Sequence, residues 1–225
     1  MLASETEARA WLAARHADAT ARLDLLVAAL AEENGRQNLV SRPSLESVWQ
    51  RHIADSAQLL HVSRETLPVG AWLDLGSGAG FPGLVVAALE PERPVTLVDS
   101  RRLRTEWLTR AAGLMGLSNV EVVLSRVEDL PDRQWQVISA RAFAPLDRLL
   151  DVAARFSTPD TLWLLPKGAK AQHELNALSA NWIRAFHVEQ SLTDPAAGII
   201  VGHLHGQTGI ARTGKASSLK RGSGR

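Results

Sequence analysis

A glycine-rich stretch is the strongest candidate for chemistry in the sequence. Residues 73–83 read L-D-L-G-S-G-A-G-F-P-G, so an apolar run leads through alternate glycines into a helix-like segment. Gly76, Gly78 and Gly80 permit a turn with positive φ and let the main chain approach a ligand closely. The helix that follows offers free N–H groups at its N-terminus. We therefore expect a nucleotide-like ligand at this turn.

The identity of that ligand depends on the residues around the glycines. Residues 78–83 also satisfy the G-x-G-x-x-G pattern of NAD-binding folds, and Asp99 at the end of the next strand would hold ribose hydroxyls in either case. A dehydrogenase needs a proton relay, yet the chain has no tyrosine and no histidine between His61 and His173. Asp74 completes a D-x-G-x-G-x-G pattern that resembles motif I of class I S-adenosylmethionine-dependent methyltransferases. The pattern favours S-adenosylmethionine as the cofactor.

Three basic residues follow later strands of the same region. In an open α/β sheet the ligand lies outside the carboxyl ends of the strands, where we expect Arg126, Arg141 and Lys167. Arg141 follows the apolar run V-I-S-A and must emerge beside the cofactor, which favours a functional role. For Arg126, a surface ion pair with Glu128 or Asp129 is as well supported as a functional role. For Lys167, a solvated position at the strand end is as well supported as a ligand contact.

Histidine and cysteine restrict the chemistry further. His52 and Asp55 are one helical turn apart and could pair or cap locally. His203 and His205 share a strand face but lack a third ligand, so we predict no metal site. The chain has no cysteine, which excludes disulfides, thiolate metal centres and cysteine nucleophiles.

Methyl transfer from a sulfonium requires mainly the alignment of nucleophile, methyl carbon and sulfur. A ring nitrogen with a free lone pair needs no general base, and none is evident at the strand ends. Carbon-5 methylation of pyrimidines would need a cysteine, and R-A-F-A-P at 141–145 is unlike the N/D-P-P-Y motif of amino-group methylation. A purine ring nitrogen or a small-molecule acceptor remains.

Alternation of strand-like and helix-like segments indicates the fold that positions these residues. Strands are expected at 71–75, 95–99, 120–124, 135–140 and 161–165, with helices at 82–90, 101–116, 145–156 and 169–180. A turn at 193–197 between two further apolar runs predicts a closing antiparallel pair. Two helices are expected within 3–34, ending near Asn34-Gly35, and another from an N-cap at Ser44 to about Leu60. The fold class is α/β, with a seven-stranded, mostly parallel sheet and an N-terminal helical extension.

Length and charge suggest how the chain is organised. The 225 residues suit one α/β domain, with 1–62 as a helical segment packed on a core of 63–205. Residues 206–225 are predicted to be a disordered basic tail, since the last five cations follow the last acidic residue, Asp194. The first residues have no signal-peptide pattern and the longest apolar run, Leu84 to Leu89, is too short to span a bilayer, so we expect a cytoplasmic protein without a membrane partner.

Motifs along the chain resemble, in order, those of the RsmG (GidB) family. Besides the glycine loop they are N-L-V-S-R at 38–42, R-H-I-A-D-S at 51–56, V-D-S at 98–100, S-R-V-E-D at 125–129, A-R-A-F-A at 140–144 and L-P-K-G at 165–168. Leu103 and Gln136 depart from the family's usual lysine and acidic residue. The similarity covers about residues 20–205.

The resemblance implies a class I (Rossmann-like) methyltransferase that places a methyl group on N7 of a guanine in 16S ribosomal RNA. Its partner would be that RNA or the small ribosomal subunit, and we expect a monomer.

The resemblance also implies roles for particular residues. Cofactor contacts would come from Gly76, Phe81, the main chain at Val127 and Glu128, and Arg141, and the glycine-loop reasoning adds Gly78 and Asp99. Arg126, Arg141 and Lys167 would form a basic catalytic pocket. The competing hypotheses are a small-molecule methyltransferase and a non-catalytic S-adenosylmethionine-binding factor in ribosome assembly.

Overall fold

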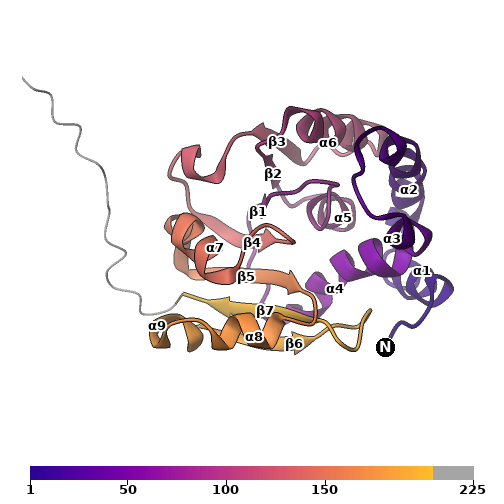
Figure 1. Cartoon of the computed structure of the whole chain (residues 1–225). Helices are drawn as coiled ribbons and strands as arrows, with labels where there is room; N and C mark the ends of the chain where they lie inside the picture. The colour runs from indigo at the N-terminus through magenta and orange to yellow at the C-terminus, as the bar shows by residue number, and fades with distance from the viewer. Residues whose placement is uncertain (205–225) are drawn as a thin grey trace, which may run out of the picture.

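The computed structural model describes residues 1–204 and contains one seven-stranded sheet. The predicted basic tail lies outside the described residues. The strand order is β3-β2-β1-β4-β5-β7-β6, and neighbouring strands are parallel except that β7 is antiparallel to both β5 and β6. The strands (Figure 1) are β1 (Trp72–Leu75), β2 (Val95–Asp99), β3 (Val120–Leu124), β4 (Trp135–Ala140), β5 (Ser157–Lys167), β6 (Phe186–Gln190) and β7 (Gly198–His203). This confirms the predicted fold class, including the closing antiparallel pair.

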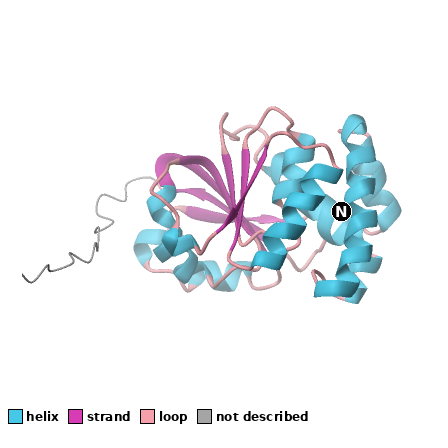
Figure 2. Ribbon diagram, turned by 90° about the horizontal axis from the view of Figure 1, so that it is seen from above, coloured by secondary structure: helices cyan, strands magenta, loops and turns pink. Residues whose placement is uncertain are grey.

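Helices cover both faces of the sheet (Figure 2). The N-terminal part forms α1 (Glu5–Ala13), α2 (Ala17–Gln37), α3 (Arg42–Glu46), the π-helix η1 (Trp49–Ala54) and α4 (Asp55–Val62). The helices that follow the strands are α5 (Gly83–Leu89), α6 (Arg102–Leu114), η2 (Val127–Asp129), α7 (Leu146–Ala153), η3 (Ala154–Phe156), α8 (Ala171–Asn176) and α9 (Ala180–Ile183). Among the described residues, no helix is long and apolar enough to cross a bilayer.

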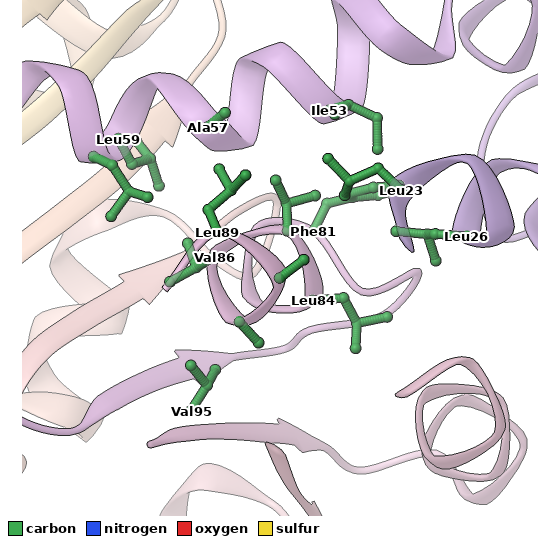
Figure 3. Packing of buried hydrophobic residues seen from close by; sticks show 14 of the residues in the cluster. Leu23, Leu26, Ile53, Ala57, Leu59, Phe81, Leu84, Val86, Leu89 and Val95 are labelled. Carbon is green, nitrogen blue, oxygen red and sulfur yellow. The ribbon is translucent and has the colours of Figure 1, made fainter. Parts of the chain in front are cut away.

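Alternation along the buried strands supplies two separate hydrophobic cores. Trp72 and Val137 face one core, whereas Leu73 and Ile138 face the other, because successive strand residues point to opposite faces of the sheet. The first core includes α5 together with Leu23 and Leu26 of α2 and Ile53, so the N-terminal helices share one apolar cluster with the sheet (Figure 3). The division of the chain into units at residues 62 and 63 stays a prediction.

The region predicted as one helix from Ser44 to about Leu60 is three helical pieces. Ser41, and not Ser44, is the N-cap of α3, since its hydroxyl accepts a hydrogen bond from the Ser44 N–H. Pro43 fits the first turn of a helix, so the cap must precede it. The chain then passes through the π-helix η1 before α4 begins. Helix α2 also runs past the predicted end near Asn34-Gly35, because Asn38 adopts a left-handed conformation (φ 45°) and caps it.

Candidate active site

The glycine loop forms the turn expected between β1 and α5. The N–H groups of Gly76 and Ser77 both donate to the Val98 carbonyl of β2, which fixes the start of the loop. Gly76 and Gly78 have φ values of +69° and +53°. A Cβ on Gly78 would meet no protein atom closer than 3.6 Å, so the main chain there is open to close approach by a ligand.

Asp74 lies beneath this loop and not in it. Its side chain is fully buried, and its carboxylate accepts hydrogen bonds from the Ser139 hydroxyl at 2.7 Å and from the Gly83 N–H at 3.3 Å. Burial raises the pKa of Asp74 to about 6, although these hydrogen bonds oppose the shift. The acidic residue of the D-x-G-x-G-x-G pattern thus ties β1 to β4 and to the start of α5, and it is not a direct ligand contact.

A hollow of about 420 Å³ opens at the carboxyl ends of β1, β2 and β3, and we call it the β1–β3 hollow. Asp99 is at its edge, with one carboxylate oxygen accepting from the Gly78 N–H at 3.1 Å and the other from the Arg101 N–H at 2.9 Å. Five residues predicted from sequence line this hollow together: Gly76, Asp99, Arg126, Val127 and Glu128. Gly78, Phe81, Arg141 and Lys167 are not part of its lining.

Arg126 lies at the rim of the β1–β3 hollow. Its guanidinium is 3.4 Å from the Glu128 carboxylate, and both side chains are exposed, so the surface ion pair considered from sequence is present. The main chain of this segment is held from below, since Arg155 donates to the carbonyls of Val127 and Glu128. The sequence motifs gave no indication of this role for Arg155.

Arg141 lies on the other side of the loop, against the N-terminal helices. Its Nη1 atom is within hydrogen-bonding distance of the Arg51 carbonyl (3.4 Å), His52 Nδ1 (3.1 Å) and Asp55 Oδ2 (3.4 Å). The guanidinium also lies over the ring of Phe81, 5.2 Å from its centroid, and the His52 ring stacks on the same ring at 4.9 Å. Phe81 is therefore buried among Arg141, His52 and the first core (Figure 3), and it does not line the β1–β3 hollow.

Two further hollows meet at Arg141 and Lys167. The β4–β5 hollow, of about 570 Å³, lies between residues 141–145 and 166–170, and the α4–β5 hollow, of about 210 Å³, is lined by His52, Asp55 and the segment 191–199. Lys167 is nearly buried, and its ammonium donates to the Ala144 carbonyl at 2.9 Å and the Glu174 carboxylate at 2.8 Å. It is therefore not the solvated strand-end lysine considered from sequence. The edge of the sheet thus carries one hollow beside the glycine loop and two beside a pair of cations.

Several residues of this site were not identified as functional candidates from sequence. His52 and Asp55 do not hydrogen-bond to each other as the local spacing suggested, and both contact Arg141 instead. Glu174 was missed, although it binds Lys167 and also accepts from the Leu146 N–H. The motif R-H-I-A-D-S was the one available signal for the first pair, and nothing in the sequence pattern pointed to Glu174.

The residues of the β1–β3 hollow fit an adenosyl sulfonium donor. The main chain at Gly78 is open, the Asp99 carboxylate ends β2 where ribose hydroxyls are bound in such folds, and the volume of the hollow lies in the range of small-molecule sites. Among the described residues, no cluster of three or more His, Asp or Glu is placed to hold a metal ion.

The seven-stranded sheet with helices on both faces has the fold of class I S-adenosylmethionine-dependent methyltransferases. Solved structures of similar fold include a mutant of MtNAS in complex with S-adenosylmethionine (TM-score 0.53, 15% identity, 80% of this chain and 72% of that chain). A second is a putative S-adenosyl-L-methionine-dependent methyltransferase from Methanococcus maripaludis (TM-score 0.50, 11% identity, 66% and 84%). At these identities the likeness concerns the fold alone.

Sequence relatives identify the family more narrowly. The profile of GidB, described as rRNA small subunit methyltransferase G, matches residues 19–197. The curated "Ribosomal RNA small subunit methyltransferase G" of Novosphingobium aromaticivorans is 68% identical over 206 residues, 90% of each chain. That of Erythrobacter litoralis is 59% identical over 210 residues, 92% of this chain and all of its own. The chain belongs to the rRNA small subunit methyltransferase G (GidB) family, as the motifs predicted.

Proposed function

We propose that the protein transfers the methyl group of S-adenosylmethionine to N7 of a guanine in the 16S RNA of the small ribosomal subunit. The observation that carries the proposal is family membership over most of the chain. The β1–β3 hollow beside the cation-bearing hollows is consistent with it, because a donor and an RNA acceptor need adjacent sites. The alternatives of a small-molecule acceptor or a non-catalytic factor have no comparable support.

The proposed reaction makes few chemical demands on the side chains. The donor supplies a methyl group on a sulfonium, and the N7 lone pair takes it in line as the C–S bond breaks, so the positive charge moves from sulfur to the purine. N7 loses no proton, and no general base is required. The task of the protein is to hold the two reactants in line and to exclude competing orientations.

For the donor, we propose contacts from the main chain at Gly76 and Gly78, the Asp99 carboxylate, and the segment at Val127 and Glu128. Support comes from the open main chain at Gly78 and from the other four lining one hollow. Phe81 is buried, so any effect it has on the donor passes through the loop that it anchors.

For the acceptor, we propose that Arg126, Arg141 and Lys167 act around the target nucleotide. Arg141 would meet a phosphate or the donor carboxylate, and not N7 and O6 of the guanine, because N7 must keep its lone pair free for attack. Further cations surround the openings: Arg101 and Arg148 line the β1–β3 hollow, and Arg51 lines the α4–β5 hollow. Exposed cations around a ligand opening suit the phosphates of RNA.

The test is to map 7-methylguanine in ribosomal RNA from cells with and without this protein. A single guanine of 16S RNA is expected to lose its methyl group in cells that lack it. The purified protein with a radiolabelled donor should then label either naked 16S RNA or the assembled subunit. Label in a low-mass product, or donor binding with no transfer to any RNA, would contradict the proposal.

Further properties follow from the same proposal. Because the substrate is ribosomal RNA, we place the protein in the cytoplasm. We also propose that it acts as a monomer, and light scattering tests this.

We propose that residues 206–225 assist RNA capture without selecting the base. The segment holds five cations and no acidic residue. Deleting it should flatten the salt dependence of binding by at most about 3.5 log units per log unit of salt, while the same guanine is modified. Identical salt slopes would leave these residues no part in RNA binding.

A further inference from the structure

Arg141 is held at one of its nitrogen atoms by a short segment of the N-terminal helices. All its hydrogen bonds to the described residues are made by Nη1, and the acceptors belong to Arg51, His52 and Asp55. The side chain is 21% exposed and lines both the β4–β5 and the α4–β5 hollows. The remaining guanidinium N–H groups make no hydrogen bond to the described residues, while Nη1 fixes the position of the group.

The π-helix explains why so short a segment can contact one guanidinium from several sides. Residues Trp49–Ala54 form the π turn, and Asp55 begins α4 directly after it. Single π turns inside helices are rare and are frequent at functional sites. Here the turn brings a main-chain carbonyl, an imidazole nitrogen and a carboxylate to the same atom.

The hydrogen-bonding state of His52 fits a fixed acceptor. A guanidinium can only donate, so Nδ1 of His52 accepts and the neutral ring must carry its proton on Nε2. Burial, with the charges of Arg141 and Arg51, lowers the pKa of His52 to about 3, which keeps the ring neutral. Nε2 is buried and has no hydrogen-bond partner among the described residues. An unsatisfied buried donor is unfavourable, so packing alone does not account for a histidine here.

Asp55 is fixed independently of Arg141. Its Oδ1 atom accepts from the Thr193 hydroxyl at 3.0 Å and from the Gln58 amide at 2.8 Å, so the turn between β6 and β7 and helix α4 both hold the carboxylate. Burial raises the pKa of Asp55, and Arg141 and Thr193 oppose that shift. The carboxylate that Arg141 meets is therefore rigid.

We propose that His52 and Asp55 are positioning residues that hold the Arg141 guanidinium between the two hollows, ready to bind the RNA or the donor. The inference rests on the proposed function, because it assigns the orientation of a residue in that site. The ring of Phe81 contacts both His52 and Arg141, so the same contacts join residues 51–55 to the glycine loop.

The experiment is a double-mutant cycle between His52 and Arg141, with methyl transfer to the wild-type protein's own RNA substrate as one readout. His52→Leu removes the acceptor, and we expect kcat/KM for RNA to fall roughly tenfold or more, since misplaced binding groups cost up to about 100-fold. His52→Asn places an oxygen near the Nδ1 position and should restore most of the loss. In an Arg141→Ala background, His52→Leu should change the rate by less than about twofold. His187→Leu, on an exposed strand position, is the matched control.

A second readout does not depend on catalysis. Side-chain NMR of Arg141 should show slow rotation about its Cζ–Nη bonds in the wild type and faster rotation in His52→Leu and in Asp55→Asn. If wild-type protein methylates no guanine N7, the proposed function fails, whatever the NMR shows. If it does methylate, two results would overturn the positioning role. The first is a double variant whose loss of kcat/KM equals the product of the losses from His52→Leu and Arg141→Ala. The second is an unchanged rotation rate of Arg141 in the folded variants.

Discussion

The two halves of the ligand-binding edge of the sheet differ in the chemical groups that line them. At the carboxyl ends of β1 to β3, glycine main chain and the Asp99 carboxylate lie beside the β1–β3 hollow, and the cations that line it, Arg101, Arg126 and Arg148, are exposed; the acidic Asp74 is buried under the loop. At the ends of β4 and β5, the hollows meet two cations, Arg141 and Lys167, each of which already has a carboxylate partner.

This difference sets how each half responds to change. A main-chain site depends on backbone conformation, so it fails when a side chain is added. A site of paired cations depends on charge and burial, so it fails when one partner is removed or changes protonation, because the remaining group is left without compensation. The predictions below separate the two halves on these grounds, beginning with pH.

His52 in the cationic half should make folding stability depend on acid pH. Its pKa is about 3 in the folded state, against 6.5 for an ordinary histidine, so the unfolded chain binds more protons between these values. Stability from this group is therefore full above about pH 6.5 and is lost as pH falls toward 3, by up to about 5 kcal/mol. Urea unfolding of wild type and His52→Asn at pH 4.5 to 7 measures it. Equal pH dependence in both proteins would show that the ring is not kept neutral by the fold.

Asp74 in the main-chain half should act with the opposite sign. Its folded pKa of about 6 lies above the ordinary 3.8, so the folded chain binds more protons in this window and stability falls as pH rises through it. The displacement corresponds to about 3 kcal/mol. Relative to Asp74→Asn, wild type should therefore gain stability as pH is lowered from 7 to 4.5. Asp24→Asn removes the carboxylate of a half-exposed ion pair and is the control: it retains Asp74, so it should keep the gain.

The main-chain half could be predicted from sequence because its parts are local. Gly76 and Gly78 lie within one turn, and the alternation of strands places Asp99 beside them without further information. In the cationic half the sequence predicted Arg141 and Lys167 at the strand ends but not their partners, since Arg141 meets His52 and Asp55 across about ninety residues and Lys167 meets a glutamate of α8. Spacing along a chain predicts which side chains share a helix face, but it does not reveal which distant strand end that face will cover. For the same reason the sequence did not reveal that Phe81, adjacent to the glycines, is buried against His52 of the N-terminal helices, and its contact with the cofactor stays a prediction.

Removing the Arg141 side chain should affect activity more than folding. Arg141→Ala is expected to lower kcat/KM for RNA about 100-fold or more, at least about 2.7 kcal/mol. The unfolding free energy should fall by only about 1 to 2 kcal/mol, because Asp55 keeps its hydrogen bonds from Gln58 and Thr193. Methyl-transfer kinetics and thermal melting compare the two, with Arg64→Ala as an exposed control. Near-normal turnover with a large loss of stability would make Arg141 a structural residue.

Adding a single methyl group at Gly78 should weaken donor binding and leave the fold in place. A Cβ there has open space, with its nearest neighbours the Gly76 carbonyl at 3.6 Å and the Asp99 carboxylate at 4.0 Å, so it would occupy the path of an approaching ligand. We expect Gly78→Ala to lower donor affinity at least about tenfold, or 1.4 kcal/mol, by calorimetry.

Gly116→Ala is the matched control for that substitution, because its φ of +65° imposes the same left-handed strain and its Cβ also meets nothing within 4 Å. Both variants should lose about 1 to 2 kcal/mol of stability, the cost of a side chain in this conformation. Only Gly78→Ala should lose donor affinity, because Gly116 follows α6, at the end of that helix away from Asp99. Equal donor affinity in the two variants would remove the glycine loop from the donor site, and with it the division of the edge into a main-chain half and a cationic half.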